Sequence, residues 1–316
     1  MRHTGERRSS WRAAAGLLAA TVALACASAP PENAPRFPVA PKVFLDRFGA
    51  AEGLTFNGSG ELFIGADRGI WRVSPDGSAE RIADVHTHLG QAGIGERDIL
   101  AADFGPTSVF RHGPNDDGIV WRVTRDGTKT VAATGIADPN FVLVREDGSF
   151  LVSDDGTDKI YLVSADGAVR VWSQAVPYPN GLALSLDGTT LYVAQIFARL
   201  NPVVLDGKLW AIPLDAAGDP GGPPELVVEV GQGLDGLAVD RLGRVYLADN
   251  GGGKIWRVDP ETRETMLVAE GMPHVASLVF GEGDFDRRAL YATSTQRGGG
   301  TIWKVPVGVE GARLHR

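Results

Sequence analysis

Cysteine is nearly absent from this sequence, which has one, Cys26, among 316 residues. A single cysteine cannot form an intramolecular disulfide, and it cannot build a thiolate metal centre. Basic residues are also in the minority, with 31 Lys and Arg against 39 Asp and Glu and a net charge of −8. We therefore expect no nucleic-acid partner, because proteins that bind nucleic acid carry a basic surface for the phosphates.

The sequence patterns of several common enzyme classes are missing as well. No Gly-x-Ser-x-Gly segment supplies the nucleophile of a serine esterase. The glycine clusters at residues 90–95 and 251–254 match neither the dinucleotide-binding spacing nor the P-loop spacing. No long amphipathic helical pattern interrupts the chain. These absences direct attention to a different architecture.

The apolar run near the N-terminus is short. Residues 13–25 form an uncharged stretch of about 13 residues after four arginines, which is too short to span a bilayer but typical of an export signal. We predict that residues 1–26 are a signal peptide and that residues 27–41 are a Pro/Ala-rich tether. The protein is then exported and resides in the periplasm or at the cell surface.

Cys26 gives this segment two interpretations. The run Ala23-Leu24-Ala25-Cys26 resembles the box at which bacterial lipoproteins are cleaved and lipidated, although a Leu is more usual where Ala23 stands. Ordinary signal cleavage nearby is the alternative, in which Cys26 is removed or has no role. A lipid on Cys26 would be the only expected link to a membrane.

The chain does contain a short phrase that recurs six times. It reads apolar–aromatic–any–apolar, most often Ile-Trp-Arg-Val, and its aromatic residues lie about 40 to 50 residues apart. These aromatics are Trp71, Trp121, Tyr161, Trp210, Trp256 and Trp303. A near-constant period of this length is typical of repeat architectures. We interpret the repeated aromatics as packing residues rather than as a ligand-stacking box.

A second apolar, β-rich run precedes each phrase. Runs such as Phe150–Asp154 and Val245–Asp249 have the composition of strands, and Asp-Gly pairs that favour tight turns follow several of the phrases. Six units of four antiparallel strands predict an all-β fold, a six-bladed β-propeller over residues 42–316. The even spacing argues against a β-sandwich. Residues 42–48 also look like a strand, which we expect to pair with the last blade and close the ring.

Four repeats share a polar residue at the start of the predicted inner strand. Glu52, Asn140, Asn180 and Asp235 each stand eight residues before a turn glycine. The innermost strand of every propeller blade lines the central channel, so equivalent positions should converge on the axis. Taken singly, Asn-Gly and Asp-Gly are more often plain turns. The shared register favours a common site.

All four side chains offer oxygen, the ligand atom that hard cations prefer. We predict that they hold a divalent cation, Ca²⁺ first, with Mg²⁺, Mn²⁺ or Zn²⁺ as alternatives. Two carboxylates about 4 Å apart repel each other by about 4 kcal/mol at an effective dielectric constant of 20. A bound dication would remove that cost from Glu52 and Asp235.

At these positions the sequence resembles the gluconolactonase and senescence-marker-protein family of six-bladed propellers. The resemblance covers about residues 42–306 and rests on the Glu-Gly pair at Glu52 and on three longer segments. These segments are Pro179–Leu182 with Leu191–Val193, Asp235–Asp240, and Phe280–Gly281 with Leu290–Thr293. Members hold a divalent metal with a Glu, two Asn and an Asp. The resemblance therefore implies Glu52, Asn140, Asn180 and Asp235 as metal ligands.

The sequence departs from the family pattern at two points. Asn140 is followed by Phe141 and Val142, where members often have Asp and Gly. Asp138 and Pro139 stand where some members carry an Arg that contacts sugar lactones. The second departure weighs against gluconolactone itself as the substrate.

The resemblance implies a hydrolase that acts on a small-molecule lactone or a related ester. Asp235 is the candidate base or nucleophile, and His274, at the start of the sixth repeat, is the candidate proton shuttle, with a structural or solvated histidine as the alternative. A non-catalytic exported propeller that binds a ligand or partner and holds a structural metal is the alternative from another class. We expect a monomer. Residues 85–97, 111–117 and 198–206 are expected to form the rim above the channel.

The lipoprotein interpretation is testable in cells that export the protein. It predicts that a radioactive fatty acid labels the wild-type chain and does not label the Cys26→Ser variant. An unlabelled wild-type chain would exclude the anchor and leave ordinary signal cleavage.

Overall fold

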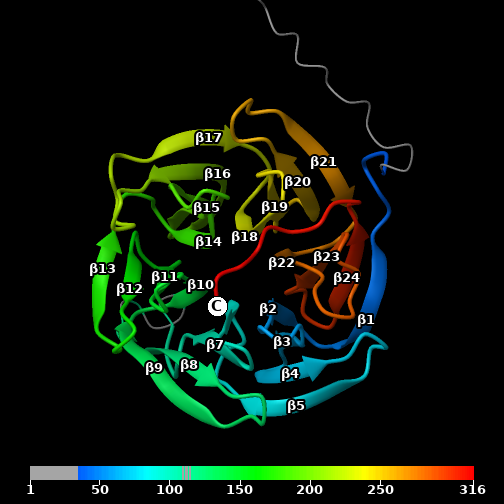
Figure 1. Ribbon diagram of the computed structural model, residues 1–316, viewed down its shortest axis with the longest axis horizontal. Coiled ribbons are helices and arrows are strands. Elements are labelled where there is room, and N and C mark those ends of the chain that lie inside the picture. Colours follow the sequence, from blue (N-terminus) through cyan, green and yellow to red (C-terminus); the bar gives the residue numbers. More distant parts are fainter. Residues whose placement is uncertain (1–34, 109, 111–112, 114) are drawn as a thin grey trace, which may run out of the picture. The chain divides into compact units, whose positions relative to one another are not determined.

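Six four-stranded antiparallel sheets stand around a central axis, as Figure 1 shows. This computed structural model describes residues 35–108, 110, 113 and 115–316. Five sheets consist of four consecutive strands, and the sixth takes its outer strand from the beginning of the described chain. The prediction of a six-bladed β-propeller is confirmed. The predicted signal peptide, with Cys26, and the tether up to residue 34 lie outside the described residues.

The sheets are named blades 1 to 6 in chain order, and their strands are given from the innermost to the outermost. Blade 1 contains β2 (Ala51–Phe56), β3 (Leu62–Ala66), β4 (Gly69–Val73) and β5 (Ala79–Asp84); blade 2 contains β6 (Gln91–Ile94), β7 (Asp98–Asp103), β8 (Gly118–Val123) and β9 (Lys129–Ile136). Blade 3 contains β10 (Pro139–Val144), β11 (Phe150–Asp154), β12 (Ile160–Val163) and β13 (Val169–Ser173); blade 4 contains β14 (Pro179–Leu184), β15 (Thr190–Leu200), β16 (Val203–Pro213) and β17 (Glu225–Glu229). Blade 5 contains β18 (Leu234–Val239), β19 (Val245–Asp249), β20 (Lys254–Val258) and β21 (Thr265–Glu270); blade 6 contains β22 (Val275–Phe280), β23 (Ala289–Ser294), β24 (Gly300–Pro306) and β1 (Lys42–Phe48).

The two repeated sequence phrases form the second and third strands of each blade, and a side-chain hydrogen bond joins them in three blades. Trp121 Nε1 donates to Asp103 Oδ2 at 2.9 Å, and Trp256 Nε1 donates to Asp249 Oδ2 at 3.0 Å. In blade 4 a glutamine takes the place of the aspartate, and Trp210 Nε1 donates to it. The aromatic residue therefore fixes the polar residue that ends the neighbouring strand.

The aspartate at the end of the second strand also holds the loop that leads into the inner strand of its blade. Asp103 accepts hydrogen bonds from the backbone N–H groups of His86 and Thr87, both at 2.9 Å. Asp249 accepts one from Gln232 N at 2.7 Å. Each such carboxylate thus ties the backbone N–H groups of that loop to the end of the second strand. The repeat thus sets where each inner strand begins.

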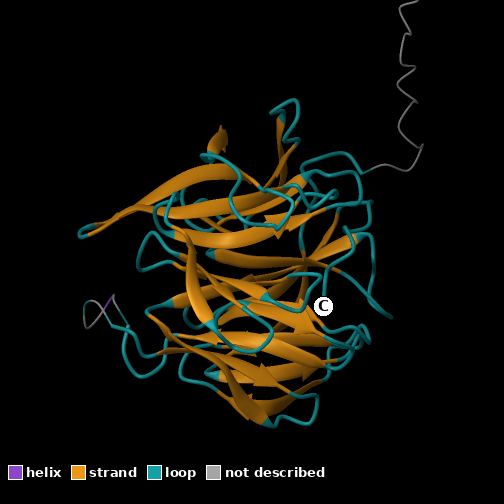
Figure 2. Cartoon of the chain, turned by 60° about the vertical axis from the view of Figure 1, so that its left-hand side comes forward, coloured by secondary structure: helices purple, strands orange, loops and turns teal. Residues whose placement is uncertain are grey.

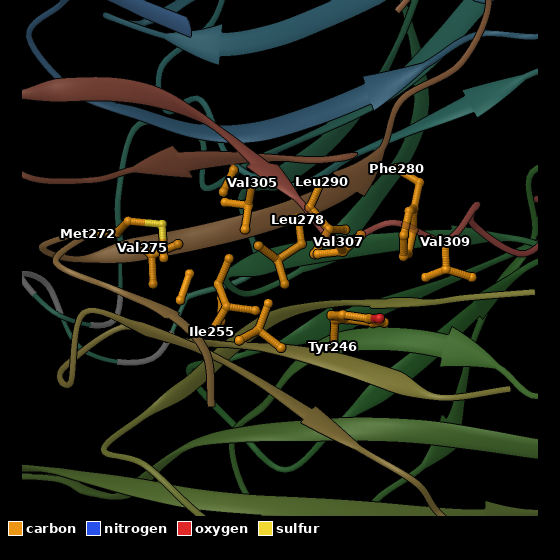
Figure 3. Packing of buried hydrophobic residues seen from close by; sticks show 14 residues of the cluster. Tyr246, Ile255, Met272, Val275, Leu278, Phe280, Leu290, Val305, Val307 and Val309 are labelled. Carbon is orange, nitrogen blue, oxygen red and sulfur yellow. The ribbon is translucent and has the colours of Figure 1, made fainter. Parts of the chain in front are cut away.

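The hydrophobic core lies between neighbouring blades. Figure 3 shows the cluster between blades 5 and 6, where Tyr246 and Ile255 pack against Leu278 and Val305. The rings of Tyr246 and Phe280 meet edge to face, with centroids 5.5 Å apart. Such side chains come from both sheets, so each blade is stabilised by its neighbours rather than by itself.

Residues 35–41 differ from the prediction of a tether. Phe37 and Val39 pack against the cluster between blades 5 and 6, and Val39 N donates to Val268 O at 2.8 Å. The guanidinium of Arg257 lies 5.1 Å from the centre of the Phe37 ring. These apolar side chains give the segment enough buried surface to be ordered.

The side view in Figure 2 shows the strands of the blades stacked between loops at both ends. Within the part of the chain that the structure describes, no helix has the length and apolarity needed to cross a membrane.

The ring closes through β1, as the sequence predicts. Strand β1 pairs antiparallel with β24, with Val43 opposite Trp303 and Leu45 opposite Ile302. Leu45 and Phe48 point into the core between blades 6 and 1, whereas Val43 is 54% exposed. Pairing of the two ends of the described chain removes an open sheet edge.

The buried face of β1 should therefore carry most of the energy of closure. We expect Phe48→Ala to lower the free energy of unfolding by about 3 to 5 kcal/mol, since it removes a buried aromatic ring. The matched variant Val43→Thr, on the exposed face of the same strand, should change it by less than about 0.5 kcal/mol. Urea unfolding of both variants measures the difference, and equal effects would contradict closure through this face.

Candidate functional site

An extra residue near the start of the inner strand defines the site. In β10, Pro139 and Val142 are three positions apart, while their partners Asp154 and Val152 are two positions apart. The same one-residue bulge occurs in the inner strands of blades 1, 4, 5 and 6. Bulges re-aim side chains at strand ends. Here the bulge begins at the second strand residue, which is the predicted ligand.

The strand register shows which residues are equivalent around the ring. The first residue of each of these inner strands pairs with a residue of the second strand. The residue that follows it is Glu52 in blade 1, Asn140 in blade 3, Asn180 in blade 4 and Asp235 in blade 5. Blade 6 carries Ala276 at this position. In blade 2, counting back from the pair Gln91 and Ala101 gives Leu89. Four of the six equivalent positions are therefore polar and two are apolar.

Glycine follows this position in four blades because neighbouring backbones approach closely there. A Cβ on Gly53 would lie 1.9 Å from Leu89 O, and one on Gly181 would lie 2.5 Å from Asp235 O. Gly90 faces Asn140 O in the same way, with its N–H donating to that oxygen at 2.8 Å. A side chain at these positions would push the inner strands apart.

Blades 3 and 6 lack this glycine and use a hydroxyl group instead. Phe141 N donates to Ser153 Oγ at 3.1 Å, and Ser153 Oγ donates to Asn180 O at 2.7 Å. In blade 6, Ser277 N donates to Thr293 Oγ1, which donates to Glu52 O. The departure from the family pattern at Phe141 thus has a structural compensation, and the backbone of each following ligand residue stays fixed.

The four predicted ligands line one cavity of about 190 Å³ at the entrance of the inner strands. Its other polar lining residues are Asp155, Asn250 and Thr295, and its apolar lining residues are Leu89, Phe104, Phe110 and Ile196. His274 does not line the cavity, but its Nδ1 lies 3.3 Å from Oδ1 of Asn250, which does. The structure therefore brings the four ligand candidates together and places His274 at the margin.

Sequence reasoning missed two of the cavity residues, Asp155 and Asn250. Asn140 Nδ2 donates to Asp155 Oδ2 at 3.0 Å, and Asn250 Nδ2 donates to Asp235 Oδ2 at 2.9 Å. Both residues directly follow the aspartate that ends the second strand of their blade. The run from Asp154 does form a turn, as its composition suggests. The polar residue after the repeated Asp was the available signal.

The charges in the cavity are crowded. Burial, together with the negative charge of Asp235, raises the pKa of Glu52 well above its ordinary value, although a hydrogen bond from Asn140 opposes this. Burial likewise raises the pKa of Asp235. Burial and then the charge of Glu52 raise the pKa of Asp155. Three carboxylates therefore destabilise one another when all are ionised.

Several buried polar atoms at the site have no partner in the protein. Asn180 is 1% exposed, and neither its Oδ1 nor its Nδ2 makes a hydrogen bond. Asp155 Oδ1 is also without a partner. A buried polar atom left unpaired costs about 1 to 3 kcal/mol.

An oxygen-rich, negatively charged site with such atoms fits a hard divalent cation. No cluster of three or more His, Cys, Asp or Glu side chains suited to a metal occurs among the described residues, so the amides would have to complete the ligand set.

One part of the rim prediction is wrong. Residues 85–97 were expected to form a rim loop, but Gln91–Ile94 is β6, the innermost strand of blade 2. The apolar Leu89 at the equivalent position hid this strand from a pattern based on polar residues.

Asp138, at the second departure from the family, is buried and accepts hydrogen bonds from Ser108 Oγ at 3.1 Å and Asn115 Nδ2 at 3.2 Å.

Comparison with known proteins agrees with this geometry. The model of the SMP-30/gluconolactonase/LRE-like region matches residues 151–296. The predicted family resemblance is confirmed. A gluconolactonase of Zymomonas mobilis is 29% identical over 158 residues, which are 48% of this chain and 42% of that protein. An uncharacterised protein of Sulfolobus acidocaldarius is 25% identical over 163 residues, or 50% of this chain and 56% of the relative. The chain thus spans about half the length of these two relatives.

Solved structures share the fold over most of the chain. A calcium-binding protein, regucalcin, from Agrobacterium tumefaciens has a TM-score of 0.70 at 21% identity, covering 89% of this chain and 98% of its own. A gluconolactonase from Xanthomonas campestris has a TM-score of 0.66 at 18% identity, covering 87% and 97%. At these identities the similarity establishes the propeller fold alone.

The crowded carboxylates lead to a prediction for the metal-free protein. In EDTA, Glu52→Gln should raise the free energy of unfolding by about 1 kcal/mol above neutral pH. A carboxyl whose pKa is raised by folding makes the folded state less stable as pH rises past its unfolded pKa, and the amide does not ionise. Urea unfolding measures the effect, and Glu270→Gln on the exposed end of β21 is the control. A loss of stability in Glu52→Gln would contradict the electrostatic argument.

Proposed function

We propose that this protein is a divalent-metal-dependent hydrolase of lactones or related esters. One observation carries the proposal, namely that four oxygen-bearing side chains from four blades line one cavity, and that buried Asn180 among them has no hydrogen-bond partner. The family match over residues 151–296 supports the choice of lactone chemistry.

Glu52, Asn140, Asn180 and Asp235 are the residues that would hold the cation. Their carboxylate and amide oxygens suit Ca²⁺ best, and Mg²⁺ or Mn²⁺ next. When bound, the cation would polarise the carbonyl of the ester and stabilise negative charge on its oxygen. Ser153 and Thr293 would keep the ligand strands in register through their bonds to Asn180 O and Glu52 O.

Asn250 links the two residues proposed for proton transfer. Its Nδ2 donates to Asp235 Oδ2, so its Oδ1 is the atom that faces His274 Nδ1. A carbonyl oxygen can only accept, and His274 must therefore carry its proton on Nδ1 to bond there. This leaves Nε2 of the exposed His274 free to exchange a proton with solvent.

The reaction adds one water molecule to the ester. Oxygen bonds to the carbonyl carbon, the bond from that carbon to the ring oxygen breaks, and the ring oxygen takes up a proton. As a base, Asp235 would accept the proton of the attacking water while the water oxygen bonds to the carbonyl carbon. As a nucleophile, it would attack the carbonyl carbon itself and displace the ring oxygen, and water would then hydrolyse the resulting anhydride and free the carboxylate. His274 would pass protons between the cavity margin and solvent.

Metal removal and one substitution test the proposal together. Hydrolysis of a lactone panel should be lost in EDTA and restored by Ca²⁺. Asp235→Asn should lower kcat/KM by about 100-fold or more, because it removes the candidate base or nucleophile. The exposed Asp284→Asn has the same chemistry away from the cavity and should retain full activity.

Two outcomes would contradict the proposal. Full activity of Asp235→Asn would remove this residue from the mechanism. A protein whose melting temperature rises with Ca²⁺ but which hydrolyses no lactone or ester would instead support a binding propeller with a structural metal.

A further inference from the structure

The cavity at the candidate site is lined by both polar and apolar side chains. Leu89 and Ile196 line it and are 6% and 7% exposed, and Phe104 and Phe110 line it as well. These four residues come from blade 2, the segment that follows β7, and blade 4. Phe104 packs against the core cluster that contains Leu89, so apolar side chains from separate parts of the chain form one wall beside the predicted ligands.

Aromatic rings extend this wall away from the metal ligands. The ring of Phe110 lies 6.2 Å from Phe104 and 5.7 Å from Phe197, measured between centroids. Phe197 in turn meets Tyr178 edge to face at 6.2 Å. Phe110 remains 42% exposed although it contacts two other rings. The wall therefore offers uncovered aromatic surface beside the cavity.

The hairpin of blade 4 continues the apolar surface. Strands β15 and β16 have 11 residues each, longer than any other strand described in the chain. Phe197 pairs with Leu205 in this extension, and Leu205 is 39% exposed. Val203 and Val204 beside it are 56% and 38% exposed. Exposed apolar side chains gathered on one hairpin are typical of a binding surface.

Among the described residues, those that line the cavity include no Lys, Arg or His. A phosphorylated or carboxylated substrate would find no counter-charge on these lining residues, apart from a bound cation. Hydroxyl groups on the part of a substrate that meets the apolar wall would have no partner there, and unpaired polar groups lower affinity strongly.

We propose that the substrate carries an apolar alkyl or aryl group that packs against this aromatic wall, next to the carbonyl held at the carboxylate side. This inference rests on the proposed function for the position of the reacting carbonyl. It assigns Phe104, Phe110 and Phe197 as specificity-determining residues. Neutral lactones or esters with an apolar substituent are then the substrate class.

Binding of unreactive analogues tests the inference independently of catalysis. A series of δ-lactams with linear alkyl substituents of increasing length is titrated calorimetrically into the full-length, Ca²⁺-loaded protein. The dissociation constant should fall by about fourfold for each methylene that the wall covers. A polyhydroxylated lactam should bind more weakly than the unsubstituted ring.

Two variants and a control locate the effect. Phe110→Ser and Phe197→Ser should lose most of the dependence on chain length while keeping the affinity for the unsubstituted lactam. Phe110 is partly exposed, so its replacement leaves the core intact even where Phe197→Ser disturbs folding. Leu242→Ser, which removes a side chain that is 59% exposed in the turn after β18, should leave the series unchanged.

The outcomes separate this inference from the proposed function. Affinities that do not depend on chain length in the wild type, or that keep their dependence in Phe110→Ser, would overturn the apolar wall as a substrate site. Graded lactam binding without hydrolysis of any lactone would keep the wall and refute the hydrolase. Hydrolysis of a lactone together with lactam affinities that do not change with chain length would keep the hydrolase and refute the wall.

Discussion

The site depends on how closely neighbouring inner strands approach each other at the residue after each bulge. Where that residue is glycine, as at Gly53 and Gly181, the next blade's carbonyl oxygen occupies the space of a side chain. Where it is Phe141 or Ser277, a hydroxyl from the adjacent strand bridges the two backbones. Either device fixes the second inner-strand residue beside the axis. Ring closure acts on the same contact, because β1 completes the blade whose Thr293 holds Glu52 O.

The repeat is broken in blade 3, which carries two residues of the candidate site, Asn140 and Asp155. In blades 2 and 5 a tryptophan donates to the aspartate that ends the second strand. Blade 3 has Tyr161 at the aromatic position, and Asp154 Oδ2 is left without a hydrogen-bond partner. Burial raises the pKa of Asp154. The next residue, Asp155, turns into the cavity and bonds Asn140. Local rules of a fold are commonly broken at functional sites, and blade 3 follows that pattern.

The sequence predicted what is periodic and missed what is not. The six aromatic phrases repeat at near-constant spacing, so they predicted the blades, and the shared distance to a turn glycine predicted four cavity residues. Strand β6 was not predicted because Leu89 breaks the polar pattern and because the glycines in and around this strand resemble those of a loop. Asp155 and Asn250 were not predicted as cavity residues because each lies in a turn, and the geometry of a turn decides where its side chains point. The aromatic wall was not predicted because the fold brings Phe197 of blade 4 into contact with Phe110, which follows a strand of blade 2.

The mixed lining of the cavity follows in part from the two blade positions that lack a polar ligand residue. Ala276 leaves room beside Asn250 and Thr295, whereas Leu89 adds a buried apolar surface on the side of Phe104. A metal held by the remaining four residues would therefore face an asymmetric space. A substrate carbonyl has one orientation in which its polar atoms meet the amides and its hydrocarbon meets the rings. The reverse orientation would bury hydrocarbon against carboxylates and leave polar atoms unpaired, which costs free energy on both sides. Under the proposed function, substrate orientation and substrate class would both follow from the same pattern of six residues around one axis.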